Sequence, residues 1–392
     1  MSDFTARGGE LHCEDVPLAR LAEEHGTPLY VYSTRALLRH YRAFDDAFAH
    51  LPHLICFAMK ANDHLAILRL FARAGAGFDV VSGGELWKAR RAGAEAAKIV
   101  FSGVGKTEAE IEYALTEGIL MLNVESPQEL DAVARVAARL GVRAPISLRV
   151  NPDVDPKTHP YISTGMKKSK FGIDIADAVA HYRHAHRSGH LALIGVDCHI
   201  GSQVTEVAPF VDALARVRQL IGRLAEEGLA GELRYLDFGG GVGITYKDET
   251  PPAPAAYAAA LADGLRGLPL TLVLEPGRAL VGNAGVFLTR VLYRKDTSAK
   301  RFVIVDGAMN DLVRPALYGS YHAVEPVRPR GGATIVADVV GPVCESGDFL
   351  ARDRELEAPE PGDLLAVRSA GAYGFVMASN YNARPRAAAI LV

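Results

Sequence analysis

Cysteine is scarce in this sequence: four occur in 392 residues, at positions 13, 56, 198 and 344. They are widely separated, without a CxxC pair or the Cys/His spacing of metal ligands, so neither a disulfide framework nor a zinc site is expected. Cys56 and Cys198 lie in apolar runs typical of strands and are predicted to be small core residues. Cys344 differs, because it opens the polar segment CESGD.

Long apolar runs and a surplus of one charge are also absent. The sequence contains no run of about 18 apolar residues, the length that would span a bilayer. The first residues, MSDFTARGGE, lack the charged region followed by an apolar region that is typical of a signal peptide. The 43 basic and 46 acidic residues are well mixed and give a formal net charge of -3, so no basic face for nucleic acid or membrane is expected. We predict a cytoplasmic protein that acts on a small molecule.

Short apolar runs alternate with amphipathic segments from Leu54 onward. Eight such runs, each but the last followed by a helical stretch, predict an α/β fold, a (β/α)8 barrel of the TIM type. Ser82 and Glu85 form an S-x-x-E capping box that starts one helix, and Gly93 suits its end. The expected strands are LICFAMK, GFDVVS, KIVFSG, ILMLNVES, PISLRVN, LIGVDCHIG, YLDFGGG and LTLVLEP.

The pattern changes near residue 280. The runs GVFLTRVLYRK, RFVIVDG, ATIVADVVG and DLLAVRSAG are separated by Gly, Pro and Asp clusters, which predicts a mostly β domain of the sandwich or barrel type. LYVYS, at 29–33, is expected to add a strand to it. We therefore predict a barrel over 35–280 and a second domain assembled from 1–34 and 281–392.

Residues with chemical potential follow the predicted strands, where barrels of this type carry their chemistry. Lys60 ends the first strand, Asp79 lies in the second, His199 ends the sixth and Glu275 ends the eighth. An amine in apolar surroundings loses its proton more easily, so Lys60 is a candidate Schiff-base nucleophile. A solvated lysine that extends from a strand end is the alternative.

The segment GGGVG, at 239–243, ends the seventh strand and offers the mobile backbone and N–H groups that a phosphate needs. The loops after strands 7 and 8 are the usual phosphate site of such barrels. The spacing matches neither a dinucleotide fingerprint nor a P-loop, so a tight turn is the alternative. Ser202, in HIGSQ, would add a hydroxyl group to the same phosphate.

Glu275 stands near Arg278 in EPGR, and a surface ion pair is one interpretation of the two. The combination favours another: a lysine amine, a phosphate cradle, a carboxylate and an imidazole are the parts that hold pyridoxal 5'-phosphate. A carboxylate keeps the pyridine nitrogen protonated, so that the ring accepts electrons. His199 would stack on the ring, although a hydrogen-bonded polar residue without such a role is the alternative.

An ordered set of motifs extends over nearly the whole chain, from about Leu29 to Asn382: FAMKAN, GFDVVSGGEL, HPYISTGMKKSKFG, HIGSQ, GGGVG, EPGR, MNDLVRPALYG, CESGD and GAYG. In this order they resemble the diaminopimelate decarboxylases, fold-type III pyridoxal phosphate enzymes with an alanine racemase-like barrel. Phe57 stands where that family has tyrosine, a departure that we expect to alter packing only.

The resemblance implies a carboxy-lyase that converts meso-2,6-diaminopimelate to L-lysine and carbon dioxide, the last step of lysine biosynthesis. Lys60 would bind the cofactor covalently, His199 would stack on its ring and Glu275 would meet the pyridinium nitrogen. Cys344 would donate a proton across the interface of a head-to-tail homodimer, whose shared active sites the β domain helps to form. Further cofactor ligands would be Asp79, Ser202, Gly240, Gly241, Gly277, Arg278 and Tyr373, and substrate ligands would be Arg278, Arg314, Tyr318, Glu345 and Tyr373.

The physical chemistry of the substrate residues agrees with this implication. Arg278 and Arg314 offer planar donors for a second carboxylate, and Glu345 offers an anion for its ammonium group. Ornithine or lysine would need only the anion, and a buried arginine without a carboxylate would be costly. A decarboxylase of another amino acid or polyamine precursor, an amino acid racemase and a non-catalytic pyridoxal phosphate carrier stay open as alternatives.

Overall fold

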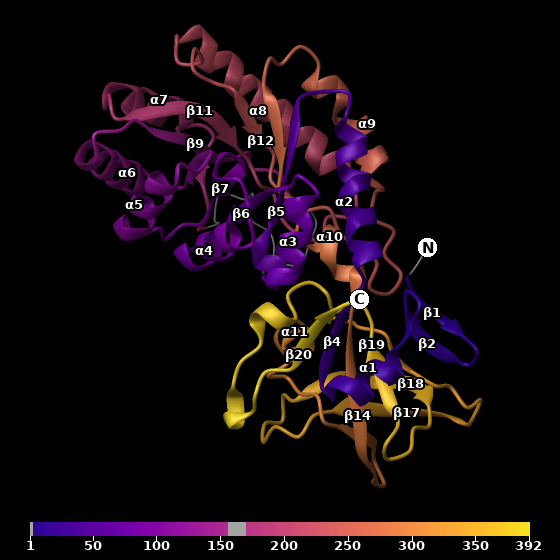
Figure 1. Cartoon of the computed structure of the whole chain (residues 1–392). Coiled ribbons are helices and arrows are strands. Elements are labelled where there is room, and N and C mark those ends of the chain that lie inside the picture. Colours follow the sequence, from indigo (N-terminus) through magenta and orange to yellow (C-terminus); the bar gives the residue numbers. More distant parts are fainter. Residues whose placement is uncertain (1–2, 156–169) are drawn as a thin grey trace. The chain divides into compact units, whose positions relative to one another are not determined.

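The computed structural model describes residues 3–155 and 170–392, and the chain divides into two compact units (Figure 1). Unit 1 contains Met1–His40, Ile244–Glu249 and Arg278–Val392, and unit 2 contains Tyr41–Gly243 and Thr250–Gly277. The domain limits expected from the sequence, 35–280 and 1–34 plus 281–392, stay a prediction. Residues 159–169 of the HPYISTGMKKSKFG motif lie outside the described residues.

Unit 2 contains the predicted closed barrel of parallel strands (Figure 1). Each strand pairs with the next, and the last strand, β13, pairs with the first, β5, which completes the ring. A short strand, β10 (Ile173–Asp174), lies beside β9. In order, the barrel strands that the structure describes are β5 (His53–Ala58), β6 (Gly77–Val80), β7 (Ile99–Phe101), β8 (Met121–Val124), β9 (Ala144–Asn151), β11 (Leu191–Asp197), β12 (Tyr235–Asp237) and β13 (Thr271–Leu274).

Helices connect these strands and lie outside the ring (Figure 1). The predicted helix start at Ser82 is confirmed, because its hydroxyl oxygen accepts the Glu85 N–H at 3.1 Å. The reciprocal bond of the capping box differs, since the Glu85 carboxylate accepts the N–H of Val81. Gly93 has the expected positive φ, +94°. These helices are α3 (Leu65–Arg73), α4 (Gly83–Arg91), α5 (Glu108–Glu117), α6 (Pro127–Leu140), α7 (Ala178–Arg187), α8 (Ala208–Glu226) and α9 (Pro254–Leu265), and α2 (Thr34–Phe48) precedes the first strand.

The barrel strands carry an apolar cluster followed by polar residues. Cys56, Val100, Met121 and Val273, from four different strands, pack together as a buried cluster. Side chains two residues apart on a strand share a face, so the residues two positions further along lie on the same inner face. These are Ala58, Ser102, Asn123 and Glu275. The apolar cluster thus supports a polar layer nearer the carboxyl ends of the strands.

Unit 1 is mostly β, as predicted. Its longest strand, β14 (Gly285–Asp296), pairs with β4 (Leu29–Tyr32), so the expected contribution of LYVYS is confirmed. All four residues of β4 are buried. The other elements of unit 1 are β1 (Phe4–Arg7), β2 (Glu10–Cys13), β3 (Val16–Pro17), α1 (Leu18–His25), α10 (Arg278–Val281), β15 (Arg301–Val305), α11 (Arg314–Tyr318), β16 (Val324–Pro326), β17 (Thr334–Val340), β18 (Phe349–Glu357), β19 (Leu364–Val367) and β20 (Ala388–Leu391).

Cys56 and Cys198 are buried, as the sequence predicted. Cys13, Cys56 and Cys198 are buried free thiols, and Cys344 is exposed. Phe57 is fully buried, and its ring centroid lies 4.7 Å from that of Phe71. Among the residues that the structure describes, no helix has the length and hydropathy needed to cross a bilayer.

Candidate active site

Lys60 lies two residues beyond β5, in the 3-10 turn Met59–Ala61. Its Nζ atom forms an ion pair with Oδ2 of Asp79 on β6, and the Asp79 side chain is fully buried. The expectation of apolar surroundings for this amine is therefore wrong, because a buried carboxylate contacts it. The purely solvated alternative also fails, since Asp79 fixes the position of the amine.

The glycines of GGGVG allow a close approach of three chain segments in unit 2. A Cβ atom on Gly240 would lie 2.3 Å from the carbonyl oxygen of Glu275. On Gly241, where φ is +114°, it would lie 2.5 Å from the carbonyl oxygen of Gly201. Neither approach tolerates a side chain, so only glycine fits at these two positions and no side chain covers the backbone of the loop there.

Ser202 is brought beside this glycine loop. The N–H of Val204 donates to the carbonyl oxygen of Gly241 at 2.9 Å, and the N–H of Gly243 donates back to Val204 at 3.0 Å. These bonds form an isolated parallel bridge between the two segments. The HIGSQ loop and the GGGVG loop therefore form one continuous surface, as a shared phosphate group would require.

His199 lies two residues beyond β11 and contacts the same loop. Its Nδ1 atom accepts a hydrogen bond from the N–H of Gly240 at 3.1 Å, so the neutral ring carries its proton on Nε2. Burial lowers the pKa of His199 well below its usual value, and the charges of Arg149 and Lys60 lower it further. His199 is thus a flat, neutral ring held against the glycine loop.

Glu275 follows β13 and is 6% exposed, so the alternative of a surface ion pair is wrong. Burial raises the pKa of Glu275 well above its ordinary value, and the carboxylates of Asp237, Asp79 and Asp197 raise it further. The charge of Lys60 opposes this rise in pKa. Glu275 is therefore a buried acid that holds a proton readily, as a partner of a basic ring nitrogen should.

Gly277 lies two residues after Glu275 in the EPGR segment and packs closely on the lysine turn. A Cβ atom on Gly277 would approach that of Ala61 to 3.0 Å and that of Ala58 to 3.1 Å. The absence of a side chain thus keeps the end of β13 against the turn that carries Lys60.

Two buried arginines converge on one tyrosine in unit 1. Arg278 and Arg314 are 8% and 6% exposed. The hydroxyl oxygen of Tyr246 accepts a hydrogen bond from Nη1 of Arg278 at 2.6 Å, and the Arg314 guanidinium carbon lies 4.7 Å from the Tyr246 ring centroid. Tyr373 adds a second ring, whose centroid is 4.8 Å from the Arg278 guanidinium carbon. The aromatic rings thus hold two positive charges without neutralising them.

Arg314 is further held by neutral groups. Its Nη1 atom donates to Nε2 of His322 at 2.9 Å, and Nη2 donates to Oγ of Ser320 at 3.3 Å. Nδ1 of His322 donates to the carbonyl oxygen of Arg368 at 2.8 Å, which leaves Nε2 as the acceptor. Burial lowers the pKa of His322 to about 3, and the charge of Arg314 adds to this shift. Burial and the charge of Arg278 lower the pKa of Arg314 from its ordinary value, and none of its described hydrogen bonds goes to an anion.

The remaining predicted residues lie elsewhere in unit 1. Tyr318 ends α11, which Arg314 begins. Cys344 and Glu345 are exposed, and the Cys344 N–H donates to Oδ1 of Asn382 at 3.0 Å. Their roles stay predictions.

The buried carboxylate of Asp348 shapes the CESGD segment. It accepts the N–H groups of Met309 and Val343 at 2.7 Å each. The motifs CESGD and MNDLVRPALYG are thereby tied together.

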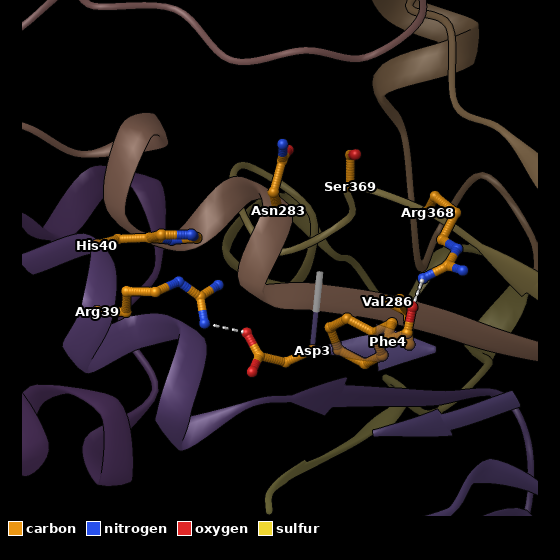
Figure 2. A pocket seen from close by; sticks show the side chains of 8 residues that line it. All are labelled: Asp3, Phe4, Arg39, His40, Asn283, Val286, Arg368 and Ser369. Carbon is orange, nitrogen blue, oxygen red and sulfur yellow. Dashed lines mark hydrogen bonds and ion pairs between the residues drawn. The ribbon is translucent and has the colours of Figure 1, made fainter. Parts of the chain in front are cut away.

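Unit 1 also contains a cavity of about 400 Å³, shown in Figure 2. Of its two arginines, Arg39 pairs with Asp3 at 2.5 Å, and Arg368 pairs with Glu325. Both charges are thus matched by acids of the protein, and none of the predicted site residues lines the cavity. The cavity offers an anion no uncompensated charge.

Several residues that surround the predicted site residues were not predicted from the sequence. Tyr246 lies three residues after the glycine motif, in GGGVGITY, and its position was a usable signal. Asn123 is a polar residue inside an apolar strand, which was a second signal. His322 lies in a loop without any pattern, so only the folded structure identifies it.

The unit 2 residues fit pyridoxal 5'-phosphate. Gly240 and Gly241 leave a cradle that a Cβ atom would close, Lys60 offers an amine, and Glu275 offers a buried acid. Within the described ranges, no group of three or more His, Cys, Asp and Glu residues could hold a metal ion. A closed barrel with this set of groups at the carboxyl ends of its strands defines a barrel-type pyridoxal phosphate enzyme.

Comparison with known proteins gives the family. Residues 34–282 match the family model described as "Pyridoxal-dependent decarboxylase, pyridoxal binding domain", and the chain belongs to this family. Its relatives over the full length are named diaminopimelate decarboxylase. The protein of that name from Pseudomonas aeruginosa is 58% identical over 392 residues, which cover 100% of this chain and 94% of the relative.

Solved structures agree with this assignment. Diaminopimelate decarboxylase from Helicobacter pylori, complexed with L-lysine, is 43% identical, with a TM-score of 0.92 over 96% of this chain and 94% of that one. The M. jannaschii enzyme, in co-complex with L-lysine, is 39% identical, with a TM-score of 0.94 over 99% of this chain and 92% of that one. The predicted fold class, a TIM-type barrel with a mostly β second domain, is confirmed.

Proposed function

We infer that this chain is a carboxy-lyase that uses pyridoxal 5'-phosphate to convert meso-2,6-diaminopimelate to L-lysine and carbon dioxide. The observation that carries the inference is the meeting of Lys60, Asp79 and Glu275 in the barrel of a chain whose full-length relatives are diaminopimelate decarboxylases. When bound, the cofactor supplies an electron sink for the electron pair left at the α-carbon as carbon dioxide departs.

Unit 2 would hold the cofactor. Lys60 would bind it covalently, and Asp79 keeps the amine in place before that bond forms. Ser202 and the loop that contains Gly240 and Gly241 would bind its phosphate group through a hydroxyl and backbone N–H groups. Gly277 keeps the chain close to the lysine turn, and we propose Arg278 and Tyr373 of unit 1 as further ligands.

Glu275 and His199 of unit 2 would control the protonation of the cofactor ring. Burial raises the pKa of Glu275, and its carboxylate would accept a hydrogen bond from the protonated ring nitrogen. His199 is neutral, so its imidazole would stack on the ring without adding a competing charge. The expected result is a ring that stays protonated throughout the reaction.

Unit 1 would recognise the second amino acid head of the substrate. Arg314 presents a charge whose described hydrogen bonds go to neutral partners, so a carboxylate would be its natural counterion. Tyr246 connects it with Arg278. Tyr318 and Glu345 would complete the recognition, with Glu345 facing the ammonium group. These charges favour a diaminodicarboxylic acid over the simple diamine precursors.

We further propose a head-to-tail homodimer in which Cys344 of one chain donates the proton to the α-carbon in the site of the other. The exposure of Cys344 supports this proposal, because a thiol that acts across an interface must lie at the surface of its own subunit. Localisation in the cytoplasm stays a prediction from the sequence.

The function is tested by supplying the purified protein and pyridoxal 5'-phosphate with meso-, LL- and DD-diaminopimelate, lysine, ornithine and arginine. We expect carbon dioxide and L-lysine from the meso isomer. Gas release from ornithine but not from meso-diaminopimelate would overturn the substrate, and loss of optical activity without gas release would identify a racemase. A Lys60→Ala variant should give no borohydride-trapped adduct, which would identify Lys60 as the attachment point, and release of carbon dioxide by the wild type would exclude a non-catalytic carrier on the same barrel.

The shared site is tested by mixing inactive subunits. Lys60→Ala and Cys344→Ala subunits, dissociated and reassembled together, should form hybrid dimers with one intact site. We expect about a quarter of the wild-type activity per subunit, as random pairing of two subunits predicts. No recovery after mixing, with a confirmed exchange of subunits, would place Cys344 within its own chain's site or outside the mechanism.

A further inference from the structure

The buried side chain of Asn123, on β8, has a fixed orientation in the barrel interior. Its Oδ1 atom accepts the hydroxyl hydrogen of Ser147 at 2.5 Å. Its Nδ2 atom donates to Oδ2 of Asp237 at 3.0 Å and to Oγ of Ser102 at 3.1 Å. Each polar atom of the amide thus has a partner, and its two donors go to Asp237 on β12 and to Ser102 just beyond β7.

Asp237 connects this amide with Glu275. Its Oδ1 atom accepts the N–H of Gly239 at 3.0 Å, and the carbonyl oxygen of Gly239 accepts the N–H of Glu275 at 2.7 Å. Burial raises the pKa of Asp237 to about 6, whereas hydrogen bonds with Asn123, with Gly239 and with the Glu275 carboxyl group oppose the rise. Asp237 is therefore coupled to Glu275 through the backbone and through the carboxyl groups.

A second connection passes through Ser102. Since the Ser102 oxygen accepts from Asn123, its own hydrogen is directed to Oε1 of Glu275, at a longer distance of 3.4 Å. Asn123 and Ser102 lie in the polar layer above the apolar cluster, on the same inner face as Glu275. Both connections end at the acid that would meet the cofactor ring.

We propose that Asn123 is a positioning residue of this enzyme: through Asp237 and Ser102, it fixes the place and orientation of the Glu275 carboxyl group. Asn123 supplies two N–H donors in a region where Asp79, Asp197, Asp237 and Glu275 crowd together. An acid at this position would face Asp237 without a donor between them. This inference rests on the proposed function of the site, because it assigns Asn123 to the reaction through Glu275.

The test is the isosteric change Asn123→Asp, combined with the exchange Asn123→Asp/Asp237→Asn. The single variant removes both donors and opposes two carboxyl groups. The double variant restores one donor and one acceptor between the same two positions. Like the wild type, it has one acid at these two positions. The second change would not repair a structural defect at either position, whereas it would restore the positioning of the Glu275 carboxyl group.

Two measurements report on the proposal. The first is the nitrogen-15 chemical shift of pyridoxal phosphate labelled at its ring nitrogen and bound to the protein, which reports the protonation of the ring. The second is the division of the activity loss between kcat and KM. For Asn123→Asp we expect a shift towards the unprotonated ring, a kcat reduced about 10- to 100-fold and a KM within about threefold.

In the double variant, a large part of both changes should be regained. The control is Asn310→Asp, the same change at another buried asparagine, in unit 1, which should leave the nitrogen signal unaltered. If Asn123→Asp does not fold, Ser147→Ala provides the milder variant, because it removes only the bond that orients the amide; a smaller shift in the same direction is expected.

The results separate this inference from the proposed function. A wild-type protein that binds no pyridoxal phosphate or releases no carbon dioxide would refute the proposed function. A wild-type protein that does both, together with an Asn123→Asp variant whose nitrogen signal and kcat are unchanged, would refute only the role of Asn123. A double variant no better than the single one would refute it equally.

Discussion

Replacement of Arg314 by lysine tests the recognition of the second carboxylate most directly. Lysine keeps the positive charge but loses the planar fork that lets Arg314 contact His322, Ser320 and the Tyr246 ring at once. The loss of one charge-assisted hydrogen bond to the substrate costs about 1.5–3 kcal/mol, which corresponds to about a 10- to 150-fold increase in KM. We expect kcat to stay within about threefold, because the contact is remote from the reacting carbon.

Inhibition by two product-like molecules sharpens this assay. L-lysine retains the second carboxylate, so its inhibition constant should rise by the same factor as KM. The compound 1,5-diaminopentane has no carboxylate, and its inhibition constant should stay unchanged. An Arg328→Lys variant makes the same change at an exposed ion pair with Glu10 and should behave as the wild type. An unchanged KM in Arg314→Lys, or equal weakening of both inhibitors, would refute the reasoning.

Three further predictions concern other parts of the chain. Burial raises the pKa of Glu85 from 4.5 to about 7, so the folded protein binds this proton more tightly than the unfolded chain, and stability falls as the pH rises between these values. Glu85→Gln should remove up to about 3 kcal/mol of this decrease in the free energy of unfolding. Urea denaturation across this pH range measures the change, and an unaltered pH dependence of stability in the variant would contradict the prediction. Gly240→Ala places a Cβ atom 2.3 Å from the Glu275 carbonyl oxygen, so cofactor binding measured by equilibrium dialysis should be at least about tenfold weaker. The control, Gly222→Ala, adds its Cβ atom in open space and should bind the cofactor as the wild type does. Asp348→Asn deprives one of two backbone N–H groups of its acceptor and should lower the stability of unit 1 by about 1–3 kcal/mol, seen as a lower Tm; a wild-type Tm would contradict it.

The barrel could be predicted because its strands and helices differ in period and composition. Runs such as IVF and LVL are apolar on both faces, as strands covered by helices must be. The N-terminal strands β1 and β2 were not predicted, because FTAR and ELHC are short and carry polar residues. Their stability comes from packing in a cluster with Leu29, Val286 and Ala366, which the local sequence does not reveal.

The site could be predicted only where position along a strand carries information. Lys60, His199 and Glu275 follow barrel strands, so their approximate place was available from the order of the strands. The surroundings of Lys60 were not, since the pairing of β5 with β6 decides that Asp79 faces it. His322 reaches Arg314 through a loop, and no periodicity encodes such a contact.

The pairing of β4 with β14 has a consequence for synthesis of the chain. Leu29 pairs with Leu288 and Tyr32 with Gly285, so about 250 residues separate the two strands in the sequence. At a translation rate of about 5–20 residues per second, the partner of β4 leaves the ribosome about 12–50 s later. During this interval the barrel residues are being synthesised, while the apolar segment LYVY does not yet have β14 to pair with. The nascent chain therefore exposes an apolar N-terminal segment for most of its synthesis. We expect chaperones that bind short apolar peptides to act there.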